Sequence, residues 1–178
     1  MLEELIIAGF GGQGVLRLGQ LIAYAGMVDG KEVSWLPSYG PEMRGGTANC
    51  NIMYSDAPIG SPIVTSATAL ITLNGPATDK FENTVRKGGD IFVNSSIVER
   101  KIERQDVNAY YIPANDIAIK LGNARIMNMV MLGAYLEKTN LFSVDIAEKA
   151  LRHVLGASKE KLIPVNLDAM KEGAKYVK

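Results

Sequence analysis

The sequence predicts an α/β fold: a single Rossmann-like domain with a mostly parallel sheet, helices on both faces and a helical C-terminal third. Three observations support this prediction. Residues 5–14, LIIAGFGGQG, run from an apolar strand straight into a glycine-rich turn. Short apolar runs then alternate with helical segments as far as residue 112. From Asp116 onward the pattern is helical.

Length and composition indicate one domain, 1–178, whose core needs neither disulfides nor metals. The 19 Lys and Arg balance the 19 Asp and Glu, so no long-range attraction to nucleic acid or an anionic membrane is expected. Cys50, the single cysteine, excludes an intrachain disulfide and a cysteine-ligated iron–sulfur cluster. The absence of a bilayer-length apolar run and of a signal-peptide pattern predicts a cytoplasmic location.

The first two thirds of the chain contain the expected strands. They are predicted at 5–9, 32–36, 47–54, 69–73 and 90–94, with a weaker one at 107–112. The run 13–29 is predicted to be a helix because apolar positions cover most of its circumference, and Gly30 suits its C-terminal cap. The loop 37–46 carries two prolines and three glycines, which argues against regular structure. A second helix is expected over 77–87, stopped by Gly88-Gly89.

One helix of the C-terminal third is unusual. Residues 126–134 are apolar all round, so this helix must be buried on every side. In a domain of this size, we expect a partner chain to cover one face. Met127, Met129 and Met131 suggest that this contact between subunits is adaptable.

The last two helices are predicted from their caps. Ser143 is the expected N-cap of a helix over 144–155, and Ser158 is the expected N-cap of a helix that reaches toward Tyr176. His153, the only histidine, lies on the first of these helices. It has no second ligand-type side chain nearby, so neither a metal nor a catalytic role is expected for it.

The glycine turn is the first candidate site, because Gly9 and the glycines after it satisfy the GxGxxG pattern. The amides that would face a phosphate-bearing cofactor belong to Gly11, Gly12, Gln13 and Gly14. Gln13 replaces an apolar side chain where its amide could reach a ligand, which favours binding. The alternative is that the glycines only allow the helix to pack tightly on the sheet. Plain NAD binding is disfavoured, since the second strand ends without a carboxylate for the ribose.

The loop after the second strand is the other candidate site. Its candidate residues are Tyr39, Glu42, Arg44, Gly45 and Gly46. The Arg44 guanidinium suits a carboxylate or phosphate, and the two glycines after it allow close approach. The alternatives are an ion pair between Arg44 and Glu42 or across a subunit interface, and for Tyr39 a packing role at an interface. No residue is assigned to catalysis or to a metal.

These two motifs, GFGGQGV at 9–15 and PSYGPEMRGGTA at 37–48, resemble those of the gamma subunit of 2-oxoacid:ferredoxin oxidoreductases, within the pyruvate ferredoxin oxidoreductase gamma superfamily. The likeness covers nearly the whole chain, including the Met-rich helix that contains Asn128. The second motif is the more specific, because nothing in general structural chemistry requires it to recur. It is more similar to that of 2-oxoglutarate or branched-chain 2-oxoacid members than to that of pyruvate members.

The resemblance implies a multisubunit enzyme that converts a 2-oxo acid, with 2-oxoglutarate favoured, and coenzyme A into acyl-CoA, CO2 and reduced ferredoxin. Partner subunits would bind thiamine diphosphate and carry 4Fe–4S clusters. This chain alone would hold no cofactor and be inactive, while its glycine loops, at subunit contacts, could touch coenzyme A. Thiamine diphosphate is a less favoured ligand, and Glu42 is not expected to activate it, since that acid belongs to another subunit in the family.

Three rival functions stay open at this point. The chain could be the corresponding subunit of an indolepyruvate:ferredoxin oxidoreductase, which shares the glycine turn. It could be a free-standing nucleotide-binding module, although the missing ribose partner argues against this. It could also be a purely structural subunit that touches no ligand.

Overall fold

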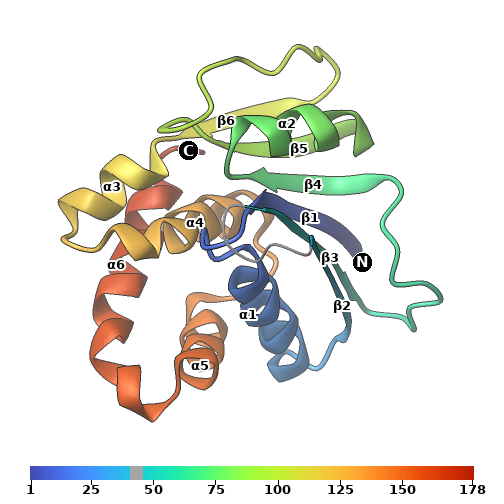
Figure 1. Ribbon diagram of the computed structural model, residues 1–178. Coiled ribbons are helices and arrows are strands. Elements are labelled where there is room, and N and C mark those ends of the chain that lie inside the picture. The colour runs from blue at the N-terminus through green and yellow to red at the C-terminus, as the bar shows by residue number, and fades with distance from the viewer. Residues whose placement is uncertain (41–45) are drawn as a thin grey trace.

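The computed structural model describes residues 1–40 and 46–178. These residues form a mixed six-stranded sheet in the order β2-β3-β1-β4-β5-β6, with helices on both sides (Figure 1). The strands are β1 (Leu2–Phe10), β2 (Glu32–Tyr39), β3 (Thr47–Ser55), β4 (Ala67–Thr72), β5 (Val85–Asn94) and β6 (Asn108–Ile112). The helices are α1 (Val15–Val28), α2 (Gly75–Phe81), α3 (Ala114–Lys120), α4 (Met127–Thr139), α5 (Val144–Leu155) and α6 (Ile163–Ala174). The predicted α/β class and helical C-terminal third are confirmed.

Strand β3 runs against the other described strands. β1 pairs in parallel with β4, β4 with β5 and β5 with β6, whereas β3 is antiparallel to both β1 and β2. The connection between β2 and β3 is only the segment 40–46, and a parallel neighbour would need a crossover of about a dozen residues or more. The sheet is therefore mostly parallel, as predicted, with one antiparallel strand inserted beside β1.

Strand β2 is longer than the sequence predicts. It continues through Pro37 to Tyr39, and Pro37 lies opposite Cys50 in the pairing with β3. The prediction that this segment is irregular is wrong. β2 is an edge strand, so the missing amide hydrogen of a proline can face away from the neighbouring strand without breaking the ladder.

The second predicted helix is too long. α2 begins after Asn74, whose side chain accepts a hydrogen bond from the Ala77 amide at 2.9 Å, and ends at Phe81. A short 3₁₀ helix follows, and β5 begins at Val85. The prediction of a helix to Lys87 is wrong, because the glycines that follow it do not stop a helix. They lie inside β5, where its pairing with β4 is irregular.

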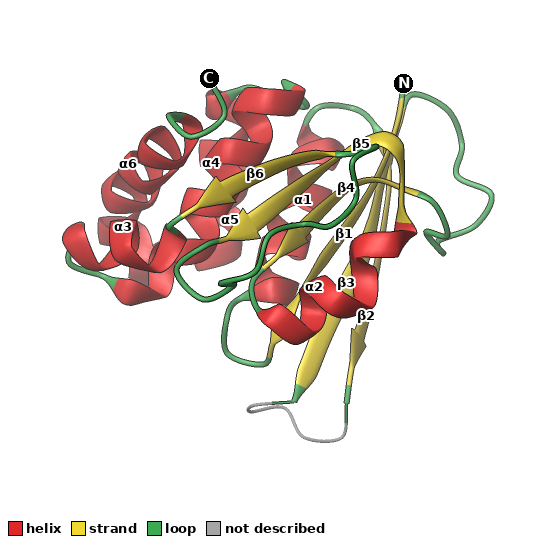
Figure 2. Cartoon of the chain, turned by 90° about the horizontal axis from the view of Figure 1, so that it is seen from above, coloured by secondary structure: helices red, strands yellow, loops and turns green. Residues whose placement is uncertain are grey.

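The two faces of the sheet are covered unequally. Figures 1 and 2 show α1, α4, α5 and α6 on one face and the short α2 on the other. Side chains of β1 alternate between the two cores: Leu5 and Ile7 join the larger core, and Ile6 joins the smaller one. Because both faces are covered, residues 5–9 have the uniformly apolar sequence of a central strand.

Helix α4 is buried by its own chain. All residues in the range Met127–Leu136 are buried, and α6 crosses so close that a Cβ on Gly133 would lie 1.9 Å from the Met170 carbonyl oxygen. The sheet, α1 and α3 cover the remaining sides. The prediction that a partner chain covers this helix, with its methionines between subunits, is wrong. The last helix of the same chain folds back over it.

The predicted caps of the last two helices have different outcomes. The Ser143 hydroxyl accepts a hydrogen bond from the Ile146 amide at 3.3 Å at the start of α5, as predicted. Ser158 does not cap α6. It lies within a 3₁₀ segment, Ala157–Leu162, and α6 begins only at Ile163, followed by a proline that suits the first turn.

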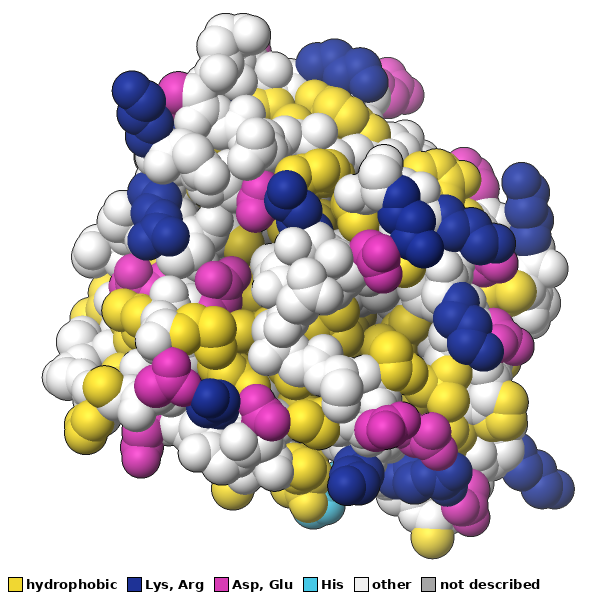
Figure 3. Space-filling model, turned by 180° about the vertical axis from the view of Figure 1, so that it is seen from behind, with side chains coloured by type: hydrophobic (Ala, Val, Ile, Leu, Met, Phe, Trp, Pro, Cys, Tyr) yellow, Lys and Arg dark blue, Asp and Glu magenta, His cyan; other side chains and the backbone are white. Residues whose placement is uncertain are grey.

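The surface carries charges of both signs. Figure 3 shows Lys and Arg side chains interspersed with Asp and Glu rather than gathered in a patch of one sign. Several form exposed pairs, such as Arg152 with Glu148 at 2.7 Å. In the part of the chain that the structure describes, no helix combines the length and apolar character needed to cross a bilayer.

Candidate functional site

The glycine turn joins β1 to α1 at the carboxyl end of the central strand. Gly12 and Gly14 have φ values of 98° and 80°, a backbone region that other residues rarely adopt. Gly14 is the N-cap of α1, and no side chain caps the helix. The first-turn amides of α1 therefore lack a capping side chain at the positive end of the helix dipole, which favours an anion there.

Gln13 is used within the chain. Its Oε1 accepts hydrogen bonds from the Phe10 amide at 2.7 Å and from Asn74 Nδ2 at 3.0 Å, and its Nε2 donates to the Leu73 carbonyl at 3.3 Å. These bonds fasten the turn to the end of β4. The expectation that its amide turns to a ligand is therefore wrong, and Gln13 belongs to the scaffold of the turn.

The structure brings the two candidate loops together at one edge of the sheet. The Gly11 amide donates to the Gly46 carbonyl at 2.8 Å, so the end of the second loop lies against the glycine turn. Tyr39, at the start of the second loop, is 57% exposed. The other candidates there, Glu42, Arg44 and Gly45, lie outside the described residues.

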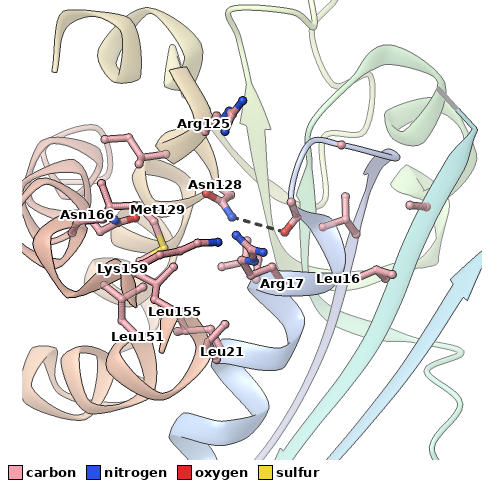
Figure 4. A pocket seen from close by; sticks show the side chains of 18 of the residues that line it. Leu16, Arg17, Leu21, Arg125, Asn128, Met129, Leu151, Leu155, Lys159 and Asn166 are labelled. Atoms are coloured by element: carbon pink, nitrogen blue, oxygen red, sulfur yellow. Dashed lines mark hydrogen bonds between the residues drawn. The ribbon is translucent and has the colours of Figure 1, made fainter. Parts of the chain in front are cut away.

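A pocket of about 720 Å³ opens beside the glycine turn (Figure 4). The turn and α1 form one wall, the start of α4 forms the floor, and α5 with the beginning of α6 forms the opposite wall. Gly11, Gly12, Gly14 and Tyr39 all line it, whereas Gln13 does not. The pocket is therefore built from segments that are distant in sequence.

Three cationic residues line the pocket, and sequence reasoning missed them: Arg17, Arg125 and Lys159. Figure 4 shows Arg17, from α1, and Lys159, from the opposite wall, pointing toward one another, while Arg125 lies at the rim. Among the described residues, none of the three forms an ion pair. Two cations directed at the same space indicate an anionic ligand.

Arg17 carried a signal that the sequence analysis could have used. It lies in the first turn of α1, where no acidic residue is present. A cation at this end of a helix opposes the helix dipole, at a cost of a few tenths of a kcal/mol to about 1 kcal/mol. An anion bound at the turn would reverse the sign of that interaction.

The sequence predicts no catalytic or metal-binding role for His153 and Cys50, and the structure gives both residues contacts within the fold. His153 stacks on Tyr24, with ring centroids 3.8 Å apart, between α5 and α1. Cys50 is fully buried, and burial raises the pKa of its thiol to about 12. A thiol with such a pKa is a poor nucleophile at neutral pH. Within residues 1–40 and 46–178, no three His, Cys, Asp or Glu side chains form a metal-binding group.

The chain is thus an α/β domain with a pocket beside its glycine turn that is lined by cationic side chains. The chain belongs to the pyruvate ferredoxin/flavodoxin oxidoreductase family, which matches residues 4–176. The recognition of gamma-subunit motifs in the sequence is confirmed.

Two relatives differ in how much of their own length this chain matches. The ketoisovalerate oxidoreductase subunit VorA of Methanothermobacter thermautotrophicus is 39% identical over 175 residues, which are 97% of this chain but 36% of the relative. The chain thus spans little more than a third of that protein. The 2-oxoglutarate synthase subunit KorC of Methanocaldococcus jannaschii is 37% identical over 184 residues, covering 100% of this chain and 95% of the relative.

Solved structures agree with the sequence matches. The gamma subunit of a keto/oxoacid ferredoxin oxidoreductase from Geobacter sulfurreducens superimposes with a TM-score of 0.82 at 29% identity, over 98% of both chains. The 2-oxoglutarate:ferredoxin oxidoreductase from Magnetococcus marinus, with 2-oxoglutarate, coenzyme A and succinyl-CoA bound, gives a TM-score of 0.89 at 25% identity. That match covers 99% of this chain and 31% of the other.

Proposed function

We propose that this chain is the gamma subunit of a multisubunit 2-oxoacid:ferredoxin oxidoreductase that uses 2-oxoglutarate. One observation carries the proposal: the 2-oxoglutarate synthase subunit of M. jannaschii matches this chain along 95% of its own length. The enzyme would convert 2-oxoglutarate, coenzyme A and oxidised ferredoxin into succinyl-CoA, CO2 and reduced ferredoxin. Its thiamine diphosphate and 4Fe–4S clusters would be held by partner subunits, and the single cysteine here fits that division of labour.

A ketoisovalerate oxidoreductase is the second candidate. It is favoured by the 39% identity to VorA, although the chain covers only 36% of that relative. The two candidates differ in the 2-oxo acid that the complex accepts. The pocket beside the glycine turn does not discriminate between them, because both reactions would use the same thiol acceptor.

In this proposal the chain itself binds and orients coenzyme A. The first-turn amides of α1, Arg17 and Lys159 offer donors and positive charge for a phosphate group. Apolar side chains of α5, including Leu151 and Leu155, line the opposite wall and suit the uncharged part of such a ligand. The Magnetococcus marinus relative, whose structure contains coenzyme A and succinyl-CoA, supports this choice of ligand.

The test is a reconstituted complex of this chain with thiamine-binding and iron–sulfur partner subunits. We expect coenzyme A-dependent reduction of ferredoxin with 2-oxoglutarate, and a much lower kcat/KM with 3-methyl-2-oxobutanoate, pyruvate or indolepyruvate. A preference for 3-methyl-2-oxobutanoate would select the second candidate. Full activity of the partner subunits without this chain, or micromolar NAD binding by this chain alone, would refute the proposal.

The pocket assignment has its own test in the same complex. Arg17→Ala and Lys159→Ala should each raise the KM for coenzyme A about 3- to 10-fold, the range expected for one partly exposed charge-assisted contact, with kcat within twofold. Lys87→Ala, which removes an exposed cation from β5 outside the pocket, is the matched control and should leave both constants unchanged.

A further inference from the structure

Asn128 is an unusual residue for its position in α4. It is 6% exposed and belongs to a run of ten buried residues that are otherwise apolar or glycine, apart from the hydroxyl of Tyr135. It is not a helix cap: the N-cap position of α4 is Ile126, and no side chain hydrogen bond caps this helix. Local helix chemistry therefore gives no reason for a buried amide here.

The Asn128 side chain lies directly against the glycine turn. Its Nδ2 donates to the Gly14 carbonyl oxygen over a long 3.5 Å, and a Cβ on Gly14 would come within 2.7 Å of that nitrogen (Figure 4). The Gly14 carbonyl also accepts the first hydrogen bond of α1, from the Leu18 amide at 2.9 Å. The turn therefore does not need Asn128 in order to satisfy its carbonyl.

The contact with Gly14 fixes the orientation of the amide. A carbonyl oxygen only accepts hydrogen bonds, so the amide nitrogen of Asn128 must face it and Oδ1 must face elsewhere. Oδ1 has no hydrogen-bond partner among the described residues, and Asn128 lines the pocket between Arg17 and Arg125 (Figure 4). An unpaired acceptor on a residue that lines the pocket can take a hydrogen bond from a ligand that carries a donor.

We propose that Asn128 positions the ligand of the pocket, its Oδ1 accepting a hydrogen bond from an N–H or O–H group beside the anion held at the start of α1. The site would then select a phosphate ester that carries a hydrogen-bond donor near its phosphate, over a simple anion. This inference rests on the proposed function, in which that ligand is coenzyme A, because its adenosine and pantetheine parts both carry such donors.

The test uses Asn128→Leu in the reconstituted complex. Leu has the same branched arrangement of side-chain heavy atoms as Asn, suits a buried apolar helix and removes the acceptor, and the Gly14 carbonyl keeps its bond to Leu18. We expect the KM for coenzyme A to rise about tenfold with kcat within twofold. The inhibition constant of sulfate against coenzyme A should stay within twofold, because sulfate carries charge but no donor at neutral pH.

Two outcomes would overturn the inference. An unchanged KM would show that Oδ1 makes no contact with the ligand. A parallel rise in the KM and in the sulfate inhibition constant would show that Asn128 only holds the shape of the turn. Asn128→Ala provides the same comparison if the leucine variant assembles poorly.

Two further variants separate this inference from the proposed function. Arg17→Ala should raise both constants, and if it changes neither, coenzyme A does not bind in this pocket and the assignment on which Asn128 depends fails. Asn94→Ala removes a buried amide at the end of β5, outside the pocket. It should alter stability but neither constant, and a tenfold rise in its KM would contradict a specific role for Asn128.

Discussion

The glycine turn is held from two sides, and the two sides differ. On the side of β4, Gln13 makes three hydrogen bonds, to Phe10, Asn74 and Leu73, so both its oxygen and its nitrogen bond within the chain. On the side of α4, Asn128 makes one long bond to Gly14 through its nitrogen and lines the pocket, and its oxygen has no hydrogen-bond partner among the described residues. The same chemical group, a carboxamide, therefore differs in its use: in Gln13 it bonds the turn to β4, and in Asn128 it leaves an acceptor unpaired.

The two amides therefore serve different purposes, one in the scaffold of the turn and one at the pocket. An amide whose oxygen and nitrogen both bond within the chain stabilises one conformation of the chain, whereas an unpaired acceptor on a pocket-lining residue is available to a ligand. The β4 side should therefore affect stability, and the α4 side should affect ligand affinity. Substitutions on the two sides test that division.

The largest effect is expected for Gly14→Ala. A positive φ costs an alanine about 1–2 kcal/mol, and the close approach of Asn128 adds about 1–3 kcal/mol of overpacking to the loss in the free energy of unfolding. Urea unfolding of the chain measures the loss. Gly30→Ala is the matched control, because Gly30 has φ 71° but no atom within 4 Å of the place that a methyl group would take. Equal losses at the two glycines would mean that α4 does not confine the turn.

Gln13→Ala should have the next largest effect. The loss of its bonds leaves buried polar groups without partners, at a cost of about 1–3 kcal/mol in the free energy of unfolding. The KM for coenzyme A should change less than twofold in the variant that still assembles. Gln20→Ala, an exposed position on α1, is the control and should stay within about 0.5 kcal/mol of the wild type. A large rise in KM without a loss of stability would reverse the assigned roles of the two sides.

Ionic strength should have a smaller effect, on the KM for coenzyme A. Because Arg17 and Lys159 are exposed at the pocket, salt screens their attraction for an anion, and the KM for coenzyme A should rise severalfold between about 50 and 300 mM salt. In Arg17→Ala the slope of KM against salt should be shallower. Steady-state kinetics at constant pH measures the dependence of KM on salt. Equal slopes in the wild type and in Arg17→Ala would exclude Arg17 from the anion site.

The smallest effect is expected at the other end of α4, where Tyr135 donates to Glu3 Oε1 at 2.9 Å. Burial raises the pKa of the Glu3 carboxyl above its ordinary 4.5. A raised carboxyl pKa gives stability that is present below pH 4.5 and lost as the pH rises through the folded-state value. Relative to wild type, Glu3→Gln should therefore gain stability as the pH rises from about 4 to 7, by less than the Gln13 effect, with no change in KM. Denaturant midpoints across this range test the prediction, and a Glu3→Gln variant that loses stability relative to the wild type as the pH rises would contradict it.

Local sequence determined much of the scaffold. The apolar run before residue 9, the glycines at 12 and 14 and the cap at Ser143 each act through neighbours in the chain, so their patterns predict a strand, a turn and a helix start directly. The two motifs also identified the family. Where these predictions failed, at Pro37 and at the end of α2, the outcome depended on position in the sheet: an edge strand tolerates proline, and a strand accepts two glycines at an irregularity.

Only the tertiary structure determined which side chains surround the glycine turn. Arg17 and Lys159 are separated by most of the chain, and only the packing of α5 against α1 and of α6 against α4 brings them to one pocket. The packing of α6 on α4 buries that helix, and the packing of α4 beside α1 places Asn128 against Gly14. Sequence by itself fixed where the chain turns and which family it belongs to, because those depend on neighbouring residues and local patterns. The placement of charges and of an open amide around that turn depends on contacts between distant segments, and these exist only once the chain has folded.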